Sequence, residues 1–286
     1  MKPIVVGIGE LLWDMLPTGK KIGGAPVNFV YHAAMNGSEG YVITAIGNDT
    51  YGDEILSEIE KYGVNVILNR NSYPTGLVNV SLDLSGIAEY DIVENSAWDY
   101  LEPNEKAYDI IRRCDCVCFG TLAQRNHVSR QAILDILSIA PNTAIKFFDI
   151  NLRQHYFDKE IILNSLSAAT ILKLNNDELR VIGQMLDISE AEDSIADRLI
   201  RDHDLQYLIL TCGDSYSKIY SKSGEMSHLI TPKVRVSDTI GAGDSFSGTF
   251  ISEILNGTDM REAHQKAVDI SAWVCTQSGA FPKYPK

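Results

Sequence analysis

Features that several common classes of protein require are missing from this chain of 286 residues. No apolar run approaches the roughly 20 residues that span a membrane, and the apolar stretch at residues 2–12 contains Glu10 and leads to no small-residue cleavage site. Positive charge is scarce, because 25 lysines and arginines face 38 acidic residues and leave a net charge of −13. Such a balance argues against nucleic acid or an anionic membrane as partner.

Cysteine is also scarce. Five cysteines in a chain without an export signal predict reduced thiols and a cytoplasmic location. Cys114, Cys116 and Cys118 are spaced by two, whereas zinc sites use two intervening residues. We therefore interpret them as small buried residues of a core strand rather than metal ligands.

Two nucleotide-binding motifs are absent or incomplete. The chain has no Gly-x-x-x-x-Gly-Lys-Ser/Thr loop, which excludes a P-loop kinase. Gly7-Ile8-Gly9 follows a strand-like run and resembles the start of a dinucleotide-binding loop, but Leu12 replaces the third glycine. A dinucleotide-dependent enzyme is therefore weakly supported.

The pattern of apolar residues alternates between strands and helices. Strands are expected at residues 4–9, 41–46, 116–120, 145–149, 170–173 and 207–211. Helices are expected at residues 53–62, 129–139, 176–185 and 191–202. This alternation predicts an α/β fold with a mainly parallel sheet covered by helices on both faces, in a single domain spanning residues 1–286. The strand carboxyl ends, and with them the ligands, should lie along one edge.

Two segments interrupt the alternation, at about residues 11–19 and 75–98. In the second, Val78, Val80, Leu82 and Leu84 alternate with polar residues before a turn at residues 84–86, as in a half-exposed antiparallel ribbon. We predict a small β-lid. Because a two-stranded ribbon cannot cover its own apolar face, we also predict a homodimer joined through this lid.

The most informative segment is Val-Ser-Asp-Thr-Ile-Gly-Ala-Gly-Asp-Ser-Phe at residues 236–246. A strand-like run at residues 233–236 leads into it, and a helical pattern follows it as far as residues 256–257. The expected arrangement is therefore a strand, a glycine-rich turn and the start of a helix. By itself, this pattern also fits an ordinary helix start that binds no ligand.

The residues at this expected helix start suit phosphoryl transfer. Gly241, Ala242 and Gly243 leave their backbone N–H groups bare, and together with the helix dipole these donors form an anion site. Asp244 follows directly, so we predict that it is the general base that accepts a hydroxyl proton. We also expect the helix terminus to lower the pKa of Asp244.

A second glycine signature stands near the start of the chain. Gly-Gly-Ala-Pro-Val-Asn at residues 23–28 leads into an expected helix at residues 29–36. With Asp-Thr-Ile-Gly-Ala-Gly-Asp at residues 238–244, it resembles the signatures of PfkB/ribokinase-family sugar kinases. Gly9-Glu10, the form Gly-Gly-Ala-Pro and Asp-Ile-Asn-Leu-Arg at residues 149–153 resemble the fructokinase branch. The resemblance covers residues 5–282 and implies a ribokinase-like three-layer αβα sandwich.

The resemblance implies that Asp14, Gly24 and Asn28 bind sugar hydroxyls. Taken singly, Asp14 could be a solvated loop acid and Asn28 a helix cap. Arg153 could hold a phosphate or sugar oxygen through two hydrogen bonds, or form a surface ion pair. Lys21 and Arg125 are the other candidate cations near the pocket.

The resemblance also implies a nucleotide site. Asn175 and Glu178 match the family's Asn-x-x-Glu, which orients Mg²⁺ through water, although Glu178 could simply cap a helix. Thr211 and Gly213 match its phosphate and adenosine loop. Asp238 and Ile240 match two positions of a monovalent-cation site, so K⁺ is a further candidate. Tyr216 and Val268 replace a glycine and an asparagine of the family, which leaves the adenine pocket open.

Together these features predict an ATP-dependent sugar kinase that needs Mg²⁺ and phosphorylates a primary hydroxyl, with D-fructose as the expected acceptor. 2-Keto-3-deoxygluconate and ribose remain alternative acceptors. An alternative of another class is a non-catalytic sugar- or nucleotide-binding protein of the same fold. The presence of Asp244 argues against this, because a binding protein needs the anion site but no base.

Overall fold

The computed structural model describes residues 1–17, 19–82, 88–188 and 191–284. Its strands form two sheets, one of nine strands and one of four. In sheet order, the larger contains β13 (Met226–Ile230), β12 (Tyr216–Ser221), β11 (Tyr207–Cys212), β10 (Ile171–Asn175), β9 (Ile145–Asp149), β8 (Cys116–Phe119), β1 (Ile4–Ile8), β4 (Glu39–Gly47) and β5 (Asn65–Asn71). All its neighbouring strands are parallel except at β12 and β13, which confirms the mainly parallel sheet.

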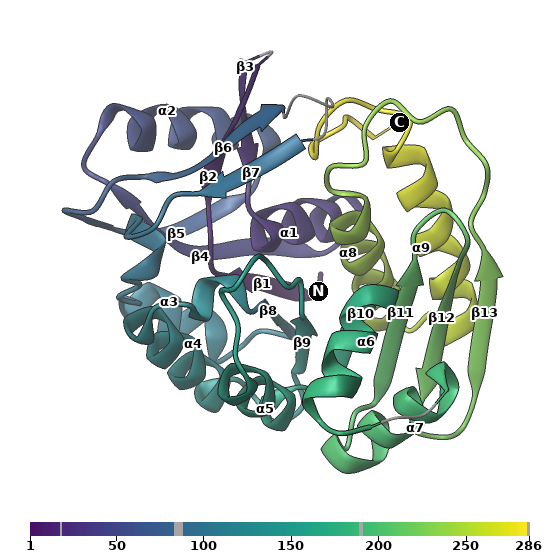
Figure 1. The fold of residues 1–286 in the computed structure, drawn as a ribbon. Helices are drawn as coiled ribbons and strands as arrows, with labels where there is room; N and C mark the ends of the chain where they lie inside the picture. The colour runs from purple at the N-terminus through teal and green to yellow at the C-terminus, as the bar shows by residue number, and fades with distance from the viewer. Residues whose placement is uncertain (18, 83–87, 189–190, 285–286) are drawn as a thin grey trace.

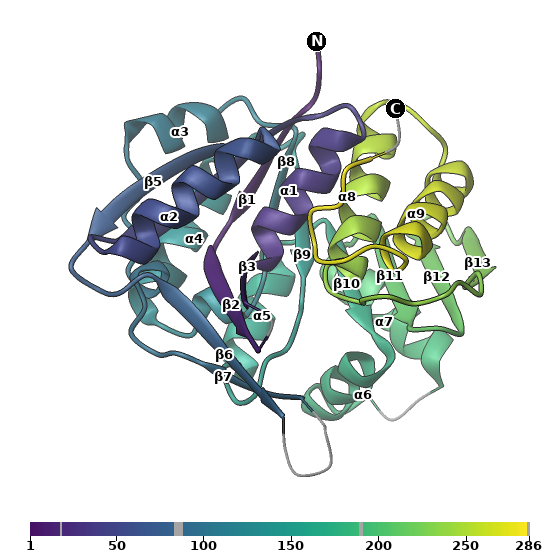
Figure 2. The same ribbon diagram turned by 90° about the horizontal axis from the view of Figure 1, so that it is seen from above.

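Helices cover both faces of the large sheet (Figures 1 and 2), so the predicted αβα layers are confirmed. One face carries α1 (Ala25–Met35), α2 (Thr50–Ile59), α8 (Ala242–Leu255) and α9 (Met260–Val274). The other carries α3 (Glu105–Ile111), α4 (His127–Ile139), α5 (Lys159–Ala168), α6 (Asn176–Met185) and α7 (Glu192–His203). Short 3₁₀ helices lie at η1 (Glu60–Tyr62), η2 (Ala97–Asp99) and η3 (Leu122–Gln124).

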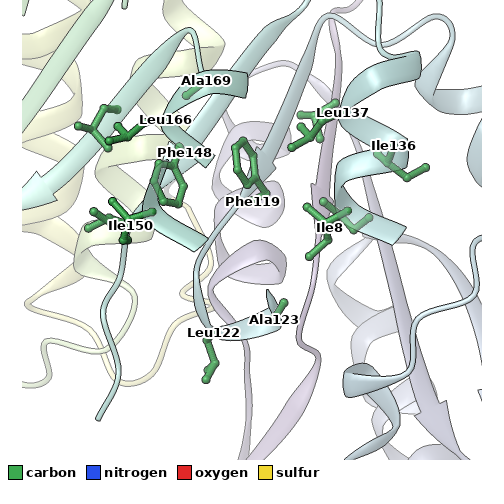
Figure 3. Packing of buried hydrophobic residues seen from close by; sticks show 14 of the residues in the cluster. Ile8, Phe119, Leu122, Ala123, Ile136, Leu137, Phe148, Ile150, Leu166 and Ala169 are labelled. Carbon is green, nitrogen blue, oxygen red and sulfur yellow. The ribbon is translucent and has the colours of Figure 1, made fainter. Parts of the chain in front are cut away.

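Strand β8 shows how the sheet feeds both hydrophobic layers. Its residues alternate, with Cys116 and Cys118 packed toward α1 and α8, and Val117 and Phe119 packed toward α4. Figure 3 shows Phe119 beside Phe148 of β9. The two rings stack with their centroids 5.1 Å apart. Cys114, Cys116 and Cys118 are all buried and unbonded, which confirms that they are core residues. Cys114, however, precedes β8 and packs in the opposite layer, so the prediction of a strand residue is wrong there.

The chain reverses its direction across the sheet between β1 and β8. From β1 it passes to β4 and β5, whereas β8, β9, β10 and β11 follow one another on the other side. Such a switch point opens a crevice at the carboxyl ends of the strands, where ligands of α/β proteins bind. The loops after β1, β8, β9 and β10 all meet there.

The smaller sheet contains β3 (Gly19–Gly23), β2 (Leu12–Leu16), β6 (Gly76–Leu82) and β7 (Ala88–Ile92) in that order. It projects beside α2, where Figures 1 and 2 show it standing away from the large sheet. Strand β3 lies beyond the segments in which the sequence indicated a lid, and the turn expected at residues 84–86 falls outside the described residues. Val78 is buried in the main core, so its side of the ribbon already has cover.

Within the described ranges, no helix has the length and apolar character needed to span a membrane.

Candidate active site

Helix α8 begins at the crevice in a conformation that glycine permits. Gly241 caps the helix with φ of 76°, and a Cβ there would lie 2.9 Å from Cβ of Ala280. In the described chain, the N–H groups of Gly241, Gly243 and Asp244 have no hydrogen-bond acceptor. The N–H of Ala242, however, donates to the Thr239 carbonyl at 3.2 Å. The prediction of three bare donors is therefore wrong at Ala242, because the turn before the helix uses that group.

The loop that leads into α8 is held by a carboxylate rather than by a strand. Residues 231–236 have no regular structure, so the strand expected at 233–236 is wrong; the antiparallel edge strand β13 ends at Ile230. Asp238 instead accepts hydrogen bonds from the N–H groups of Ile240 at 2.9 Å and Gly279 at 3.0 Å. The Lys21 ammonium of β3 lies 3.7 Å from the same carboxylate, which links the small sheet to this loop.

Asp244 is paired with Asn28 across two helices. Asn28 Nδ2 donates to Asp244 Oδ2 at 2.8 Å, while the other amide atom, Asn28 Oδ1, is buried without a hydrogen-bond partner among the described residues. Helices α1 and α8 approach closely because Gly248 has no side chain; a Cβ there would lie 2.5 Å from the Phe29 carbonyl oxygen. The unpaired Oδ1 is an acceptor that a ligand hydroxyl could satisfy.

The pKa of Asp244 moves in the direction opposite to the prediction. Burial, and next the charge of Asp149, raise it to about 6, against the hydrogen bond from Asn28. The expected decrease is wrong because the desolvation of the carboxylate outweighs the free N–H groups of the helix terminus. A carboxyl group with this pKa is still mostly ionised at pH 7, as a general base must be.

Two further carboxyl groups have raised pKa values. Burial raises the pKa of Asp14 in β2 to about 6 and that of Glu10, just after β1, to about 7. The charge of Asp244 adds to the rise in the pKa of Glu10, so these two carboxyl groups lie near each other. Gly24, with φ of 120°, turns the chain so tightly that a Cβ would collide with the Glu10 carbonyl oxygen. Glu10 was missed as a site residue; the pair Gly9-Glu10 was its only signal in the sequence.

Arg153 follows β9 and extends into the same space. Its charge lowers the pKa values of Glu10, Asp14 and Asp244, which places the guanidinium near all three. It nevertheless forms no hydrogen bond or ion pair through that group with any residue that the structure describes. The surface ion pair considered from the sequence is therefore absent from the described part. Arg153 is a cation at the crevice without a direct partner.

Arg125 was expected near the pocket, but it is part of the core. Its guanidinium donates twice to the Asp99 carboxylate at 2.7 Å and stacks on the ring of Trp98. It lines a separate cavity of about 380 Å³, together with Glu94 and Tyr156. Arg125 therefore cannot serve the site around Asp244.

The expected nucleotide residues lie on neighbouring strands. Asn175 and Thr211 are register partners in β10 and β11, and Gly213 follows in a left-handed turn. Glu178 accepts hydrogen bonds from the N–H groups of Asn175 at 2.7 Å and Leu152 at 2.9 Å. The capping role that the sequence left open is therefore real, and it ties α6 to the loop after β9.

The two departures from the family pattern have structural roles. Tyr216 donates to the Glu192 carboxylate at 2.9 Å, and Val268 lies on the buried face of α9, in the core. No group of three acidic, histidine or cysteine side chains in the described chain could hold a metal by itself.

Lys173 was also missed, because an isolated lysine in an apolar strand has no sequence motif. It is buried on β10, and its ammonium contacts both oxygens of Asp149 at 3.0 and 2.9 Å. The pair lies directly below the start of α8, where a Cβ on Gly243 would be 3.4 Å from Lys173 Nζ.

Comparisons with known proteins agree with this geometry. The family model for pfkB family carbohydrate kinases matches residues 15–286, so the chain belongs to the PfkB family of carbohydrate kinases. It is a phosphotransferase with an alcohol group as acceptor. Probable fructokinase-4 of Arabidopsis thaliana is 26% identical over 99% of this chain and 94% of its own length. Fructokinase-1 of Zea mays is also 26% identical, over 99% of this chain and 95% of its own.

Solved structures show the same fold. A fructokinase from Xylella fastidiosa with bound ATP has a TM-score of 0.86 at 21% identity, covering 98% of this chain and 94% of that one. A 2-dehydro-3-deoxygluconokinase from Thermotoga maritima has a TM-score of 0.87 at 20% identity, covering 99% and 95%. The ribokinase-like fold is thus confirmed, whereas identities this low say nothing about the acceptor.

Proposed function

We propose that this carbohydrate kinase transfers the γ-phosphoryl group of ATP to a primary hydroxyl of a small sugar, with D-fructose as acceptor. The observation that carries the proposal is the Asn28–Asp244 pair. It places a carboxylate beside the free N–H groups that begin α8 and leaves Asn28 Oδ1 buried and unpaired. A hydroxyl held there would meet a hydrogen-bond acceptor and a base together.

In the reaction, Asp244 accepts the proton of the sugar hydroxyl while the hydroxyl oxygen bonds to the γ-phosphorus. The bond from that phosphorus to the bridging oxygen breaks, and its electrons remain on the departing ADP. The free N–H groups of Gly241 and Gly243 stabilise the charge on the phosphoryl oxygens. A base with a pKa of about 6 suffices, because the hydroxyl loses its proton late in a loose transition state. A non-catalytic binding protein would not need this base.

The charges in the crevice favour a neutral sugar. Glu10, Asp14 and Asp244 contribute three carboxyl groups, and Arg153 is the cation that faces them from the loop after β9. A phosphorylated sugar or a sugar acid would bring further negative charge to this place. Relatives named as fructokinases support the same choice. The unpaired guanidinium of Arg153 favours 2-keto-3-deoxygluconate as the second candidate, because its carboxylate could bind there.

Magnesium fits the site as a companion of the nucleotide. Both oxygens of Glu178 already accept backbone N–H groups, so this residue would reach Mg²⁺ through water. When bound, Mg²⁺ would neutralise phosphate charge. A putative ribokinase from Escherichia coli has been solved in complex with ATP and Mg²⁺. We propose that Mg²⁺ is required here too; turnover that persists in a chelator would contradict this.

Potassium is a weaker proposal. Both oxygens of Asp238 are engaged by N–H groups, and Lys21 already brings a positive charge near them. A K⁺ ion would therefore rely on carbonyl groups such as that of Ile240. We propose activation by K⁺ as a testable property, which equal rates in K⁺ and in a bulky organic cation would contradict.

A screen of acceptors tests the proposed function. We expect kcat/KM for D-fructose to exceed that for ribose, 2-keto-3-deoxygluconate and fructose 6-phosphate, because a pocket built for one hydroxyl pattern disfavours others. ATP consumption is measured with each sugar, and the product mass confirms the phosphorylation. A higher value for any of the other three acceptors would reject fructose but leave the phosphotransfer unaffected.

The compartment and the oligomeric state are also proposals. All five cysteines are unbonded, which suits the reducing cytoplasm that we propose. We also propose a homodimer through the small sheet, because β3 and β7 are its edge strands and Tyr90 in β7 is 56% exposed, although Gln154 already donates to the Tyr90 carbonyl group. The burial of Val78 within its own chain removes part of the original reason for this expectation.

A further inference from the structure

The Lys173–Asp149 pair lies inside the core, as does the Arg125–Asp99 pair, but it is the one that lies beside the start of α8. The two residues are register partners in β10 and β9, and each side chain is 10% exposed. Burying such a pair often contributes little net stability, because both charges lose their hydration. Its position beside the proposed phosphoryl site therefore suggests a functional reason for keeping it.

The ammonium group of Lys173 has donor capacity to spare. An ammonium carries three N–H donors, and two of them are directed to Asp149 Oδ1 and Oδ2. No other acceptor for Nζ is present in the described ranges of the chain. Ser247 Oγ of α8 lies 3.4 Å from Asp149 Oδ2 and 3.0 Å from the Gly243 carbonyl oxygen, so the carboxylate lies between the sheet and the helix. The third donor of Lys173 remains available.

The path from this ammonium to the start of α8 is open. A Cβ on Gly243 would meet only Lys173, at 3.4 Å from Nζ and 3.9 Å from Cε. Gly243 does not have a positive φ, so its backbone conformation does not require glycine. What glycine preserves here is the space between the exposed end of the helix and the buried ammonium.

Lys173 remains charged in this environment. Burial alone would lower its pKa, but Asp149, and beyond it Glu178 and Asp244, raise the pKa above its ordinary value. The chain lacks a P-loop lysine, so the phosphates of ATP would otherwise meet a crevice rich in carboxylates. A permanent cation next to the free N–H groups of α8 would offset that repulsion.

We propose that Lys173 is a catalytic residue, whose third N–H binds the phosphoryl group during its transfer from ATP to the acceptor hydroxyl. Lys173 stays protonated throughout, while Asp244 takes the hydroxyl proton. The proposal rests on the proposed function, because it assumes that the phosphoryl group passes between Gly243 and Asp244. It makes the anion site a combination of a helix terminus and a buried cation supplied by another strand.

The test removes the charge without leaving its partner buried alone. Lys173→Met keeps the length of the side chain, and the double variant Asp149→Asn/Lys173→Met also neutralises the carboxylate. Lys218→Met is the matched control, because Lys218 is a strand lysine paired with Glu192 and Asp193 at 2.8 and 2.7 Å, far along the sheet on β12. Circular dichroism and melting temperature establish which variants are folded.

We expect the folded Lys173 variants to lose about 100-fold or more in kcat, with KM for the sugar changed less than about 3-fold. Calorimetry should show that adenylyl imidodiphosphate binds these variants about 10-fold more weakly than it binds the wild type. ADP should bind with wild-type affinity, because only the γ-phosphoryl group contacts Lys173. Lys218→Met should match the wild type in all three measurements.

A folded double variant with kcat within about 3-fold of the wild type would overturn the proposal. If ADP and adenylyl imidodiphosphate lose affinity by the same factor, the proposal is also overturned, since that result indicates a general distortion of the nucleotide site. Asp244→Asn in the same assays separates this proposal from the proposed function. If Asp244→Asn is inactive and the Lys173 variants are active, only the role of Lys173 fails; if all are active, the proposed site fails.

Discussion

The buried position of Asp244 in the proposed active site lowers the stability of the folded protein. Its carboxylate is desolvated, faces Asp149 and receives a hydrogen bond from Asn28. A carboxyl group whose folded-state pKa is raised from 3.8 to about 6 destabilises the fold increasingly as the pH rises above 3.8, and the full cost is present above about pH 6. Natural active sites often retain such costs because function requires them.

Replacing Asp244 with Asn should therefore separate activity from stability. We expect kcat to fall by about two orders of magnitude or more, because the amide cannot accept the hydroxyl proton. ATP and sugar should still bind, and the melting temperature at pH 7.5 should equal or exceed that of the wild type. Steady-state kinetics, calorimetry and thermal unfolding measure these effects. Turnover near the wild-type rate would show that Asp244 is not the base.

The pH dependence of kcat follows from the same carboxylate. Since Asp244 acts in its ionised form, activity should be full above its pKa and should fall as the pH drops through about 6. Asp14 titrates in the same range, so the profile is measured for Asp14→Asn as well. We expect the acidic limb of kcat to persist in that variant. A kcat that stays constant down to pH 5 would contradict the assignment.

The packing of α1 against α8 brings the two halves of the site together. Asn28 comes from α1 and Asp244 from α8, and their hydrogen bond depends on the close approach at Gly248. A Cβ at Gly248 would lie 2.5 Å from the Phe29 carbonyl oxygen and 2.8 Å from the Ala33 nitrogen. These are backbone atoms, so the helices would have to separate to make room.

We therefore expect Gly248→Ala to destabilise the protein by about 1–3 kcal/mol and to reduce kcat/KM as well. Gly183→Ala is the control in α6, where the nearest atom to a new Cβ is 3.2 Å away and alanine favours the helix. Its stability should stay within about 1 kcal/mol of the wild type. Urea unfolding and steady-state kinetics are measured for both variants. Wild-type stability and kcat/KM in Gly248→Ala would show that the two helices can accommodate a methyl group at this position.

The oligomeric state is decided by the surface of the whole molecule. Strands β3 and β7 form the edges of the small sheet, and the Tyr90 side chain in β7 is exposed. We expect the wild type to be a dimer by light scattering at micromolar concentration, and Tyr90→Lys to shift it toward the monomer. Ile230→Lys is the control, because Ile230 is 69% exposed at the end of β13, on the opposite edge of the large sheet. A fully active monomeric wild type would refute the dimer.

Much of the fold could be predicted from the sequence because it depends on local patterns. The alternation of apolar runs locates the parallel strands, and α6 spans the predicted residues 176–185. The run at residues 233–236 misled the prediction, because its β-branched residues fit a strand but find no partner strand. Strand propensity is effective only where another strand is available for pairing.

The sequence by itself determined the family, and it indicated the proposed anion site and the candidate base, because adjacent glycines and an aspartate carry that information within a few residues. The tertiary structure decided what depends on neighbours from distant segments. Burial determined the direction in which the pKa of Asp244 shifts. Hydrogen bonds to Asp99 keep Arg125 away from the crevice. The packing of β10 against α8 places Lys173 below the start of that helix. Desolvation and Coulomb interactions depend on distance in space, and no spacing along the chain encodes that distance.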